Sequence, residues 1–189
     1  MAVNAVSYVR GIIPDSVNRE KDDFYPTPPE GTRKLLEVET FSGKIWEPAC
    51  GDGAISKELI LAGHEVMSTD LIDRGYGKSG VDFLLDYETR SHNIITNPPF
   101  KLAEEFAWHA VARSERKVAM LCRLAWLEGS ARRRMFTGTP LARVWVFSKR
   151  LHMQRARQAV KSDAGGMIAF AWFVWEHGHK GAPELGWLS

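Results

Sequence analysis

The clearest chemistry in the chain belongs to four consecutive residues, Asn97-Pro98-Pro99-Phe100. The amide oxygen of Asn97 and the carbonyl oxygen of Pro98 are acceptors that a loop can hold beside a planar amino group. Such acceptors draw off the positive charge of the amino protons as the nitrogen becomes tetrahedral, while the Phe100 ring holds the attached plane by stacking. The tetrapeptide therefore predicts a site that alkylates an amino group. A Pro-Pro loop with a packed Phe is the structural alternative.

The residues before this loop predict how it is positioned. Ile94 and Ile95 are typical of the centre of a short buried strand, and two prolines then prevent the strand from continuing. The loop should therefore lie at the C-terminal edge of a sheet, where open α/β sheets bind ligands. A helix is expected to follow at 102–112.

A second candidate site is the turn between a strand expected at 44–47 and a helix expected at 54–62. Gly51 and Gly53 in this turn allow a ligand to approach the backbone closely. Their spacing does not match the pyrophosphate fingerprint, so a plain turn is the alternative. Asp70 ends the next expected strand, 64–70, where an acid can hold a ribose diol. A helix cap or a solvated strand tip would also explain Asp70.

Two further segments contain candidate residues. A short strand is expected at 80–85, where Asp82 can accept from an adenine amino group and Phe83 can pack on its ring. A core residue beside a cap is the alternative for this pair. Thr27 lies in the proline-rich stretch 26–29, which is expected to be extended, and can cap a helix at 30–38.

The order of elements predicts the fold class. Strands are also expected at 118–126, 141–147 and 167–175, with a helix at 131–136 and a long loop at 149–166. Six or seven strands interleaved with helices predict an α/β fold with a mostly parallel, doubly wound sheet. Residues 1–20 are expected to form a mobile arm. Residues 21–189 are expected to form one domain, because the chain has 189 residues and no internal repeat.

Composition excludes several classes of protein. The chain is 44% hydrophobic and 25% charged, which is typical of soluble globular proteins, and no apolar run is long enough to span a membrane. The N-terminus lacks the pattern of a signal peptide, and the only two cysteines give no disulfide framework. His177 and His179 lack partners at metal-ligand spacing. We therefore expect a cytoplasmic protein without a bound metal.

Charge is distributed unevenly along the chain. Residues 123–161 contain ten basic residues and one acid, so this segment carries +9 and the remainder carries −7 of the total of +2. This asymmetry predicts binding to a phosphate backbone, and a solvated basic face is the alternative. The residues that we assign to nucleic-acid binding are Arg132, Arg133, Arg134, Lys149, Arg150, Arg155 and Arg157.

The candidate motifs occur together in one order. They are Phe24-Tyr25-Pro26-Thr27-Pro28, Glu47-Pro48-Ala49-Cys50-Gly51-Asp52-Gly53, Asp70, Asp82-Phe83 and Asn97-Pro98-Pro99-Phe100. In this order and spacing, from about residue 22 to residue 113, the chain resembles the amino-methyltransferase family that acts on DNA adenine. The resemblance implies a Rossmann-like class I methyltransferase fold. Its sheet would have seven strands, mostly parallel with one antiparallel strand at 167–175, and helices on both faces.

The resemblance also implies S-adenosylmethionine as cofactor and assigns roles to residues. It places Thr27 and the glycine turn at the methionine end of the cofactor, Asp70 at the ribose, and Asp82 with Phe83 at the adenine. Asn97 and Pro98 would contact the target amine and Phe100 the flipped base. The residues assigned to the cofactor are Tyr25, Thr27, Glu47, Ala49, Gly51, Gly53, Asp70, Asp82 and Phe83.

The implied activity is methylation of adenine N6 in DNA. The chain departs from site-specific members of the family because no sizeable target-recognition domain follows the catalytic core, and in this it is similar to small enzymes of phages and prophages. Methylation of an RNA base or of a protein glutamine amide is one alternative. A module that binds nucleic acid without catalysis is another.

Overall fold

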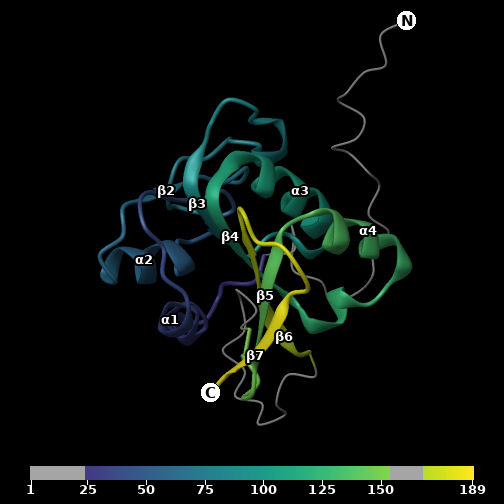
Figure 1. The fold of residues 1–189 in the computed structure, drawn as a ribbon. Coiled ribbons are helices and arrows are strands. Elements are labelled where there is room, and N and C mark those ends of the chain that lie inside the picture. Colours follow the sequence, from purple (N-terminus) through teal and green to yellow (C-terminus); the bar gives the residue numbers. More distant parts are fainter. Residues whose placement is uncertain (1–23, 154–167) are drawn as a thin grey trace, which may run out of the picture.

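The structure is a computed structural model that describes residues 24–153 and 168–189. Within these residues, strands form one sheet in the order β2-β1-β3-β4-β6-β5-β7 (Figure 1). Neighbouring strands are parallel, except that β6 is antiparallel to both β4 and β5. The mostly parallel, seven-stranded α/β sheet with one antiparallel strand is thereby confirmed. The strands are β1 Ile45–Glu47, β2 Val66–Ser68, β3 Ser91–Thr96, β4 Ser114–Arg123, β5 Leu141–Phe147, β6 Phe170–Glu176 and β7 Glu184–Leu188.

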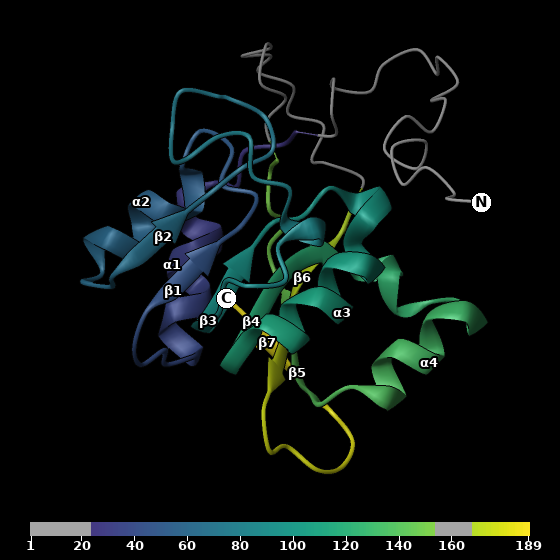
Figure 2. The same ribbon diagram turned by 90° about the horizontal axis from the view of Figure 1, so that it is seen from above.

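Helices cover both faces of this sheet, as the view from above shows (Figure 2). One face is covered by α1 (Pro29–Val38) and α2 (Ala54–Leu61), and the other by α3 (Ala103–Arg113) and α4 (Ser130–Gly138). Short 3-10 helices occur in the connections, namely η3 (Phe83–Leu85), η4 (Phe100–Leu102) and η5 (Leu124–Leu127). No helix in the described ranges is long and apolar enough to cross a membrane.

Side chains of the central strands alternate between two cores. On β4, Val118 and Met120 face the side of α3 and α4, whereas Ala119 and Leu121 face the side of α1 and α2. Strands covered on both faces contain nearly continuous apolar residues instead of an alternating pattern. This explains why the apolar run that becomes β6 was recognisable in the sequence.

The topology brings three strand ends together. From β1 the chain passes to β2 on one side and then crosses to β3 on the other side. Such a reversal opens a crevice outside the carboxyl ends of the strands, where open α/β sheets bind ligands. The glycine turn follows β1, Asp70 follows β2 and Asn97 follows β3, so this topology groups them at one edge of the sheet.

Three local predictions are wrong. Segment 80–85 is not a strand, because Asp82 Oδ1 accepts the N–H of Leu84 (3.0 Å) and thereby starts η3. Thr27 does not cap α1, whose N-cap residue is Pro28. Strand β7 was not expected, because it has only five residues and contains Gly186, and a glycine weakens the pattern of a strand. The expected N-terminal arm and most of the 149–166 loop lie outside the described residues.

Candidate active site

The glycine turn after β1 is tied to the acid after β2. The backbone N–H of Gly51 donates to Asp70 Oδ2 (2.8 Å), and that of Ile72 donates to Oδ1 (2.8 Å). Gly51 and Gly53 have φ angles of +56° and +83°, which side-chain-bearing residues rarely adopt. The carboxylate thus fixes the turn, and each of its oxygens keeps further acceptor capacity for a ligand.

Aromatic rings approach both glycines. A side chain at Gly51 would overlap the ring of Phe24, and a Cβ at Gly53 would lie 2.6 Å from the ring of Tyr76. The guanidinium of Arg74 lies 4.1 Å from the centroid of the Phe24 ring. The close approach that the glycines permit is therefore made by these two rings.

Glu47 lies beneath the turn and does not face an open site. Its side chain is 1% exposed and accepts a hydrogen bond from the hydroxyl of Ser56 in α2, which is itself 2.6 Å from the Ser68 hydroxyl. Burial raises the pKa of the Glu47 carboxyl well above its usual value, although the bond from Ser56 opposes the shift. Ala49 packs against the core on the α3 side. Both residues therefore support the turn from below.

The amide of Asn97 is oriented by the segment that precedes α1. Its Nδ2 donates to the carbonyl oxygen of Tyr25 (2.9 Å) and to the hydroxyl of the buried Thr27 (3.1 Å). Both amide hydrogens are therefore used, and among the described residues Oδ1 accepts no hydrogen bond. Pro98 is buried, and Pro99 is the N-cap residue of η4. The loop therefore presents the Asn97 oxygen as an acceptor, which is the orientation that the predicted chemistry requires.

The ring of Phe100 lies in a cluster of planar groups. The Tyr25 ring stacks with it at 6.0 Å between centroids and 22° between planes, and the Phe170 ring is 5.8 Å away. The guanidinium carbon of Arg123 lies 4.7 Å from the Phe100 centroid. Phe100 is thus next to the oriented amide, as the sequence predicted, and shares its surroundings with a cation.

Asp82 and Phe83 occupy a cap and a core position. Asp82 caps η3 through its bond to Leu84, and Phe83 is 2% exposed. The Phe83 ring packs edge-to-face on Trp46 at 5.0 Å and lies 4.9 Å from Phe106. Asp82 thus starts η3 and the Phe83 ring belongs to the core, and the assignment of this pair to the cofactor stays a prediction.

The three arginines of α4 differ in their surroundings. Arg132 donates to the carbonyl oxygens of Trp126 (2.8 Å) and Glu128. Arg133 and Arg134 are exposed. Arg132 therefore closes the start of the helix, and its two neighbours remain accessible to an anionic partner.

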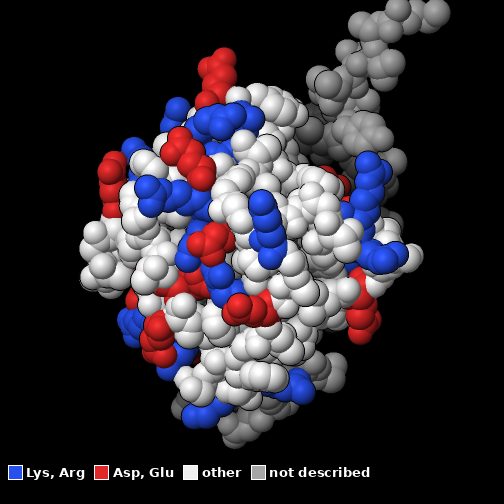
Figure 3. All heavy atoms as spheres, in the orientation of Figure 1, with Lys and Arg blue, Asp and Glu red and all other residues white. Residues whose placement is uncertain are grey.

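The other basic residues of segment 123–161 also differ in their surroundings. Arg143 is bound by Glu39 and by Glu176 (2.6 Å), so its charge is neutralised within the protein. Lys149 and Arg150 are exposed beyond β5. On the face shown in Figure 3, basic and acidic side chains are interspersed, and no continuous basic field covers that face. Outside the described residues lie Arg155 and Arg157.

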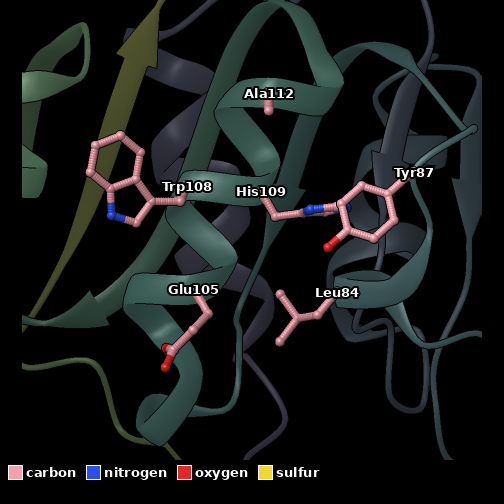
Figure 4. A pocket seen from close by; sticks show the side chains of 6 residues that line it. All are labelled: Leu84, Tyr87, Glu105, Trp108, His109 and Ala112. Atoms are coloured by element: carbon pink, nitrogen blue, oxygen red, sulfur yellow. The ribbon is translucent and has the colours of Figure 1, made fainter. Parts of the chain in front are cut away.

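A shallow hollow of about 380 Å³ lies on α3 and the loop that follows η3 (Figure 4). His109 points toward Tyr87, and its Nε2 is 2.8 Å from the carbonyl oxygen of Asp86. None of the lining residues was assigned to the site from the sequence, and none belongs to the glycine turn. The lining residues are Leu84, Tyr87, Glu105, Trp108, His109 and Ala112.

Sequence reasoning missed several residues of the crevice. Leu71 and Ile72 directly follow Asp70 and are 49% and 38% exposed. Two large aliphatic residues after an acid at a strand end were a signal available in the sequence. Tyr76 and Arg123 gave no such signal, because only the fold brings them to Gly53 and Phe100.

No protein-family model and no curated protein sequence matches the chain. Among solved structures, a putative RNA methyltransferase from Pyrococcus horikoshii matches with a TM-score of 0.61 at 15% identity, covering 80% of this chain and 85% of that chain. A modification subunit of a putative type I restriction enzyme from Vibrio vulnificus YJ016 matches with a TM-score of 0.57 at 15% identity, covering 85% of this chain and 45% of that chain.

A third match is the magnesium protoporphyrin IX methyltransferase of Synechocystis PCC 6803, whose structure contains bound S-adenosylmethionine. Its TM-score is 0.53 at 13% identity, with 78% of each chain covered. At such identities the likeness shows the fold. The chain has the Rossmann-like class I methyltransferase fold that its motifs implied.

Proposed function

We propose that the protein transfers a methyl group from S-adenosylmethionine to the exocyclic N6 amine of adenine in DNA. The observation that carries the proposal is the orientation of Asn97. Because Tyr25 and Thr27 take both amide hydrogens, the amide oxygen is left as an acceptor at the carboxyl end of β3. It lies at the same sheet edge as the turn that Asp70 fixes.

The residues of the crevice fit S-adenosylmethionine, which when bound supplies an electrophilic methyl group. The Asp70 carboxylate retains acceptor capacity for ribose hydroxyls. The exposed Leu71 and Ile72 offer an apolar surface for a purine ring. The start of α2, directly after the glycine turn, favours the carboxylate of the methionine end.

The loop Asn97-Pro98-Pro99-Phe100, called the transfer loop below, would act on the target amine through acceptors alone. The Asn97 amide oxygen and the Pro98 carbonyl oxygen accept its two N–H bonds, and these interactions strengthen as the nitrogen is alkylated and its protons become more acidic. No strong base is required, since the alkylated nitrogen loses a proton easily. The buried Glu47 carboxyl is bonded to Ser56 under the turn and is not placed to act as that base.

A nucleic-acid base is the acceptor that the surroundings favour. Phe100 offers a ring on which a flipped base can stack, and the exposed Arg133, Arg134 and Lys149 offer cations for phosphates. These cations give less reason to expect a protein glutamine as acceptor. RNA is the second candidate, because one structural neighbour is a putative RNA methyltransferase. DNA is favoured by the resemblance of the motifs.

The test is to incubate the protein with methyl-labelled S-adenosylmethionine and unmethylated DNA, RNA or peptide, and then to identify the labelled product after digestion. We expect N6-methyladenine from DNA. Asn97→Ala is the matched control, since it should abolish labelling while cofactor binding, measured by calorimetry, stays nearly unchanged. Labelled glutamine, or no cofactor binding by the wild-type protein, would contradict the proposal.

A further inference from the structure

Arg123 is a partly buried cation beside the proposed transfer loop. It is the last residue of β4, and its guanidinium carbon lies 4.7 Å from the centroid of the Phe100 ring. Its Nε is buried and has no hydrogen-bond partner among the described residues. Within residues 24–153 and 168–189 it takes part in no ion pair, whereas Arg143 is held by two carboxylates.

This arrangement opposes folding. A buried guanidinium N–H normally donates to a carboxylate or to another acceptor, and a buried donor without one destabilises the folded state. The contact with the Phe100 ring is favourable, but it gives the Nε–H no acceptor. Among the described residues, the contact with Phe100 thus leaves one buried N–H of Arg123 without an acceptor, and a ligand with acceptor atoms would supply it.

The position of Arg123 indicates which ligand this is. Strand β4 lies beside β3 in parallel, with Thr96 paired to Met120, so Arg123 and Asn97 lie at the same edge of the sheet. On its other side Arg123 pairs with Phe170, whose ring also contacts Phe100. The guanidinium therefore shares the ring on which the target base is proposed to stack.

We propose that Arg123 binds a phosphate of the target nucleotide, an inference that rests on the proposed function. A base that stacks on Phe100 brings its own phosphates to the rim of that ring. The base displaces the guanidinium from the ring, and the freed Nε–H and terminal N–H groups donate together to phosphate oxygens, the paired geometry that arginine favours. An anion at this position supplies the partner that Arg123 lacks within the described part of the chain.

The test is a double-mutant cycle between the protein and its substrate. The substrate is a duplex that the wild-type protein methylates, with or without one neutral methylphosphonate at the phosphate of the methylated nucleotide. The protein is wild type, Arg123→Gln, Arg123→Lys, or the control Arg116→Gln. Arg116 is exposed near the other end of the same strand and donates to the hydroxyl of Ser42. The dissociation constant is measured over a salt series, and the melting temperature and cofactor affinity confirm that each variant is folded.

The slope of log affinity against log salt concentration is negative. We expect Arg123→Gln to reduce its magnitude by about 0.9 on duplex DNA. The methylphosphonate should do the same to the wild-type protein, and combining the two changes should lower the slope no further. Arg123→Lys should retain most of the slope, because it retains the charge. Arg116→Gln should leave the slope and the effect of the methylphosphonate unchanged.

The outcomes separate this inference from the proposed function. An unchanged slope for Arg123→Gln, or full additivity with the methylphosphonate, overturns the assignment of Arg123 even if DNA is methylated. If Arg123→Gln does not fold, the wild-type protein alone tests the assignment of Arg123. A methylphosphonate at the target nucleotide and one at a distant phosphate are then compared, and an equal effect of the two on the slope overturns the assignment. If the wild-type protein methylates no nucleic acid, both proposals fail.

Discussion

Replacing Thr27 with valine should slow methyl transfer while the protein remains folded. Valine has nearly the shape of threonine, but it lacks the hydroxyl that accepts from Asn97 Nδ2 at 3.1 Å. Thr27 is 3% exposed, so water does not readily replace that hydroxyl. The amide would retain only the carbonyl oxygen of Tyr25 and would be less firmly held with its own oxygen toward the substrate.

The expected magnitude follows from the lost bond. A buried donor left without its partner costs about 1–3 kcal/mol. If this cost is expressed in the transition state, the transfer rate falls by about 5-fold to about 150-fold. Asn97→Ala sets the limit, because it removes the acceptor itself and should cost about 100-fold to 1000-fold or more. Thr27→Val should therefore be slower than wild type and faster than Asn97→Ala.

The assay is single-turnover methylation at saturating cofactor, with cofactor affinity and melting temperature measured separately. The control is Thr32→Val in α1. Thr32 is fully buried, and its hydroxyl has no hydrogen-bond partner in the described structure, so the same substitution removes no bond. A wild-type rate for Thr27→Val, or an equal loss in Thr32→Val, would refute the idea that Thr27 orients the amide.

Three further predictions concern other parts of the molecule. Asp70→Ala should weaken S-adenosylmethionine binding by about 10-fold to 150-fold, measured by calorimetry, since one charge-assisted bond contributes about 1.5–3 kcal/mol. Replacing Arg133 and Arg134 with alanine should make the affinity for DNA less dependent on salt, by about 0.9 in the slope of log affinity against log salt for each lost phosphate contact. Nucleoside analysis should show that the same base is methylated. An unchanged slope would mean that the two arginines form only a solvated face. Burial would raise the pKa of Glu39, but hydrogen bonds from Arg143 and other donors leave it below its ordinary value of 4.5. The Glu39 carboxylate therefore stabilises the folded state above pH 4.5, and this stabilisation is lost as the pH falls through the lowered pKa. Glu39→Gln should accordingly be less stable than wild type at pH 7. In chemical denaturation, the difference in free energy of unfolding should shrink below about pH 4.5.

Parts of the fold that depend on local signals were predictable from the sequence. The strand before Gly51 and Gly53 and the helix after them follow from short apolar runs and from glycines that only a turn requires. Asp70 was recognisable because an acid ends a strand at the expected distance from that turn. The Asn97 loop was recognisable because its prolines end a buried strand.

The remainder depends on residues that are distant in the sequence. Segment 80–85 has the composition of a strand, but a side-chain bond from Asp82 favours a 3-10 turn. The charge count of segment 123–161 included Arg143, although Glu39, 104 residues away, already binds it. The Thr27 hydroxyl was expected to cap the nearest helix, but it accepts from Asn97, 70 residues away. Composition cannot reveal such partners, because only the tertiary fold selects them.

The segment from Phe24 to Thr27 links the two halves of the crevice. Phe24 lies against Gly51, Tyr25 stacks on Phe100, and Thr27 holds Asn97. A ligand that moves the Phe24 ring at the glycine turn therefore acts on the same short segment that orients the transfer loop. A coupling free energy between two sites is reciprocal. If the cofactor raises the affinity for nucleic acid by some factor, the nucleic acid should therefore raise the affinity for the cofactor by the same factor.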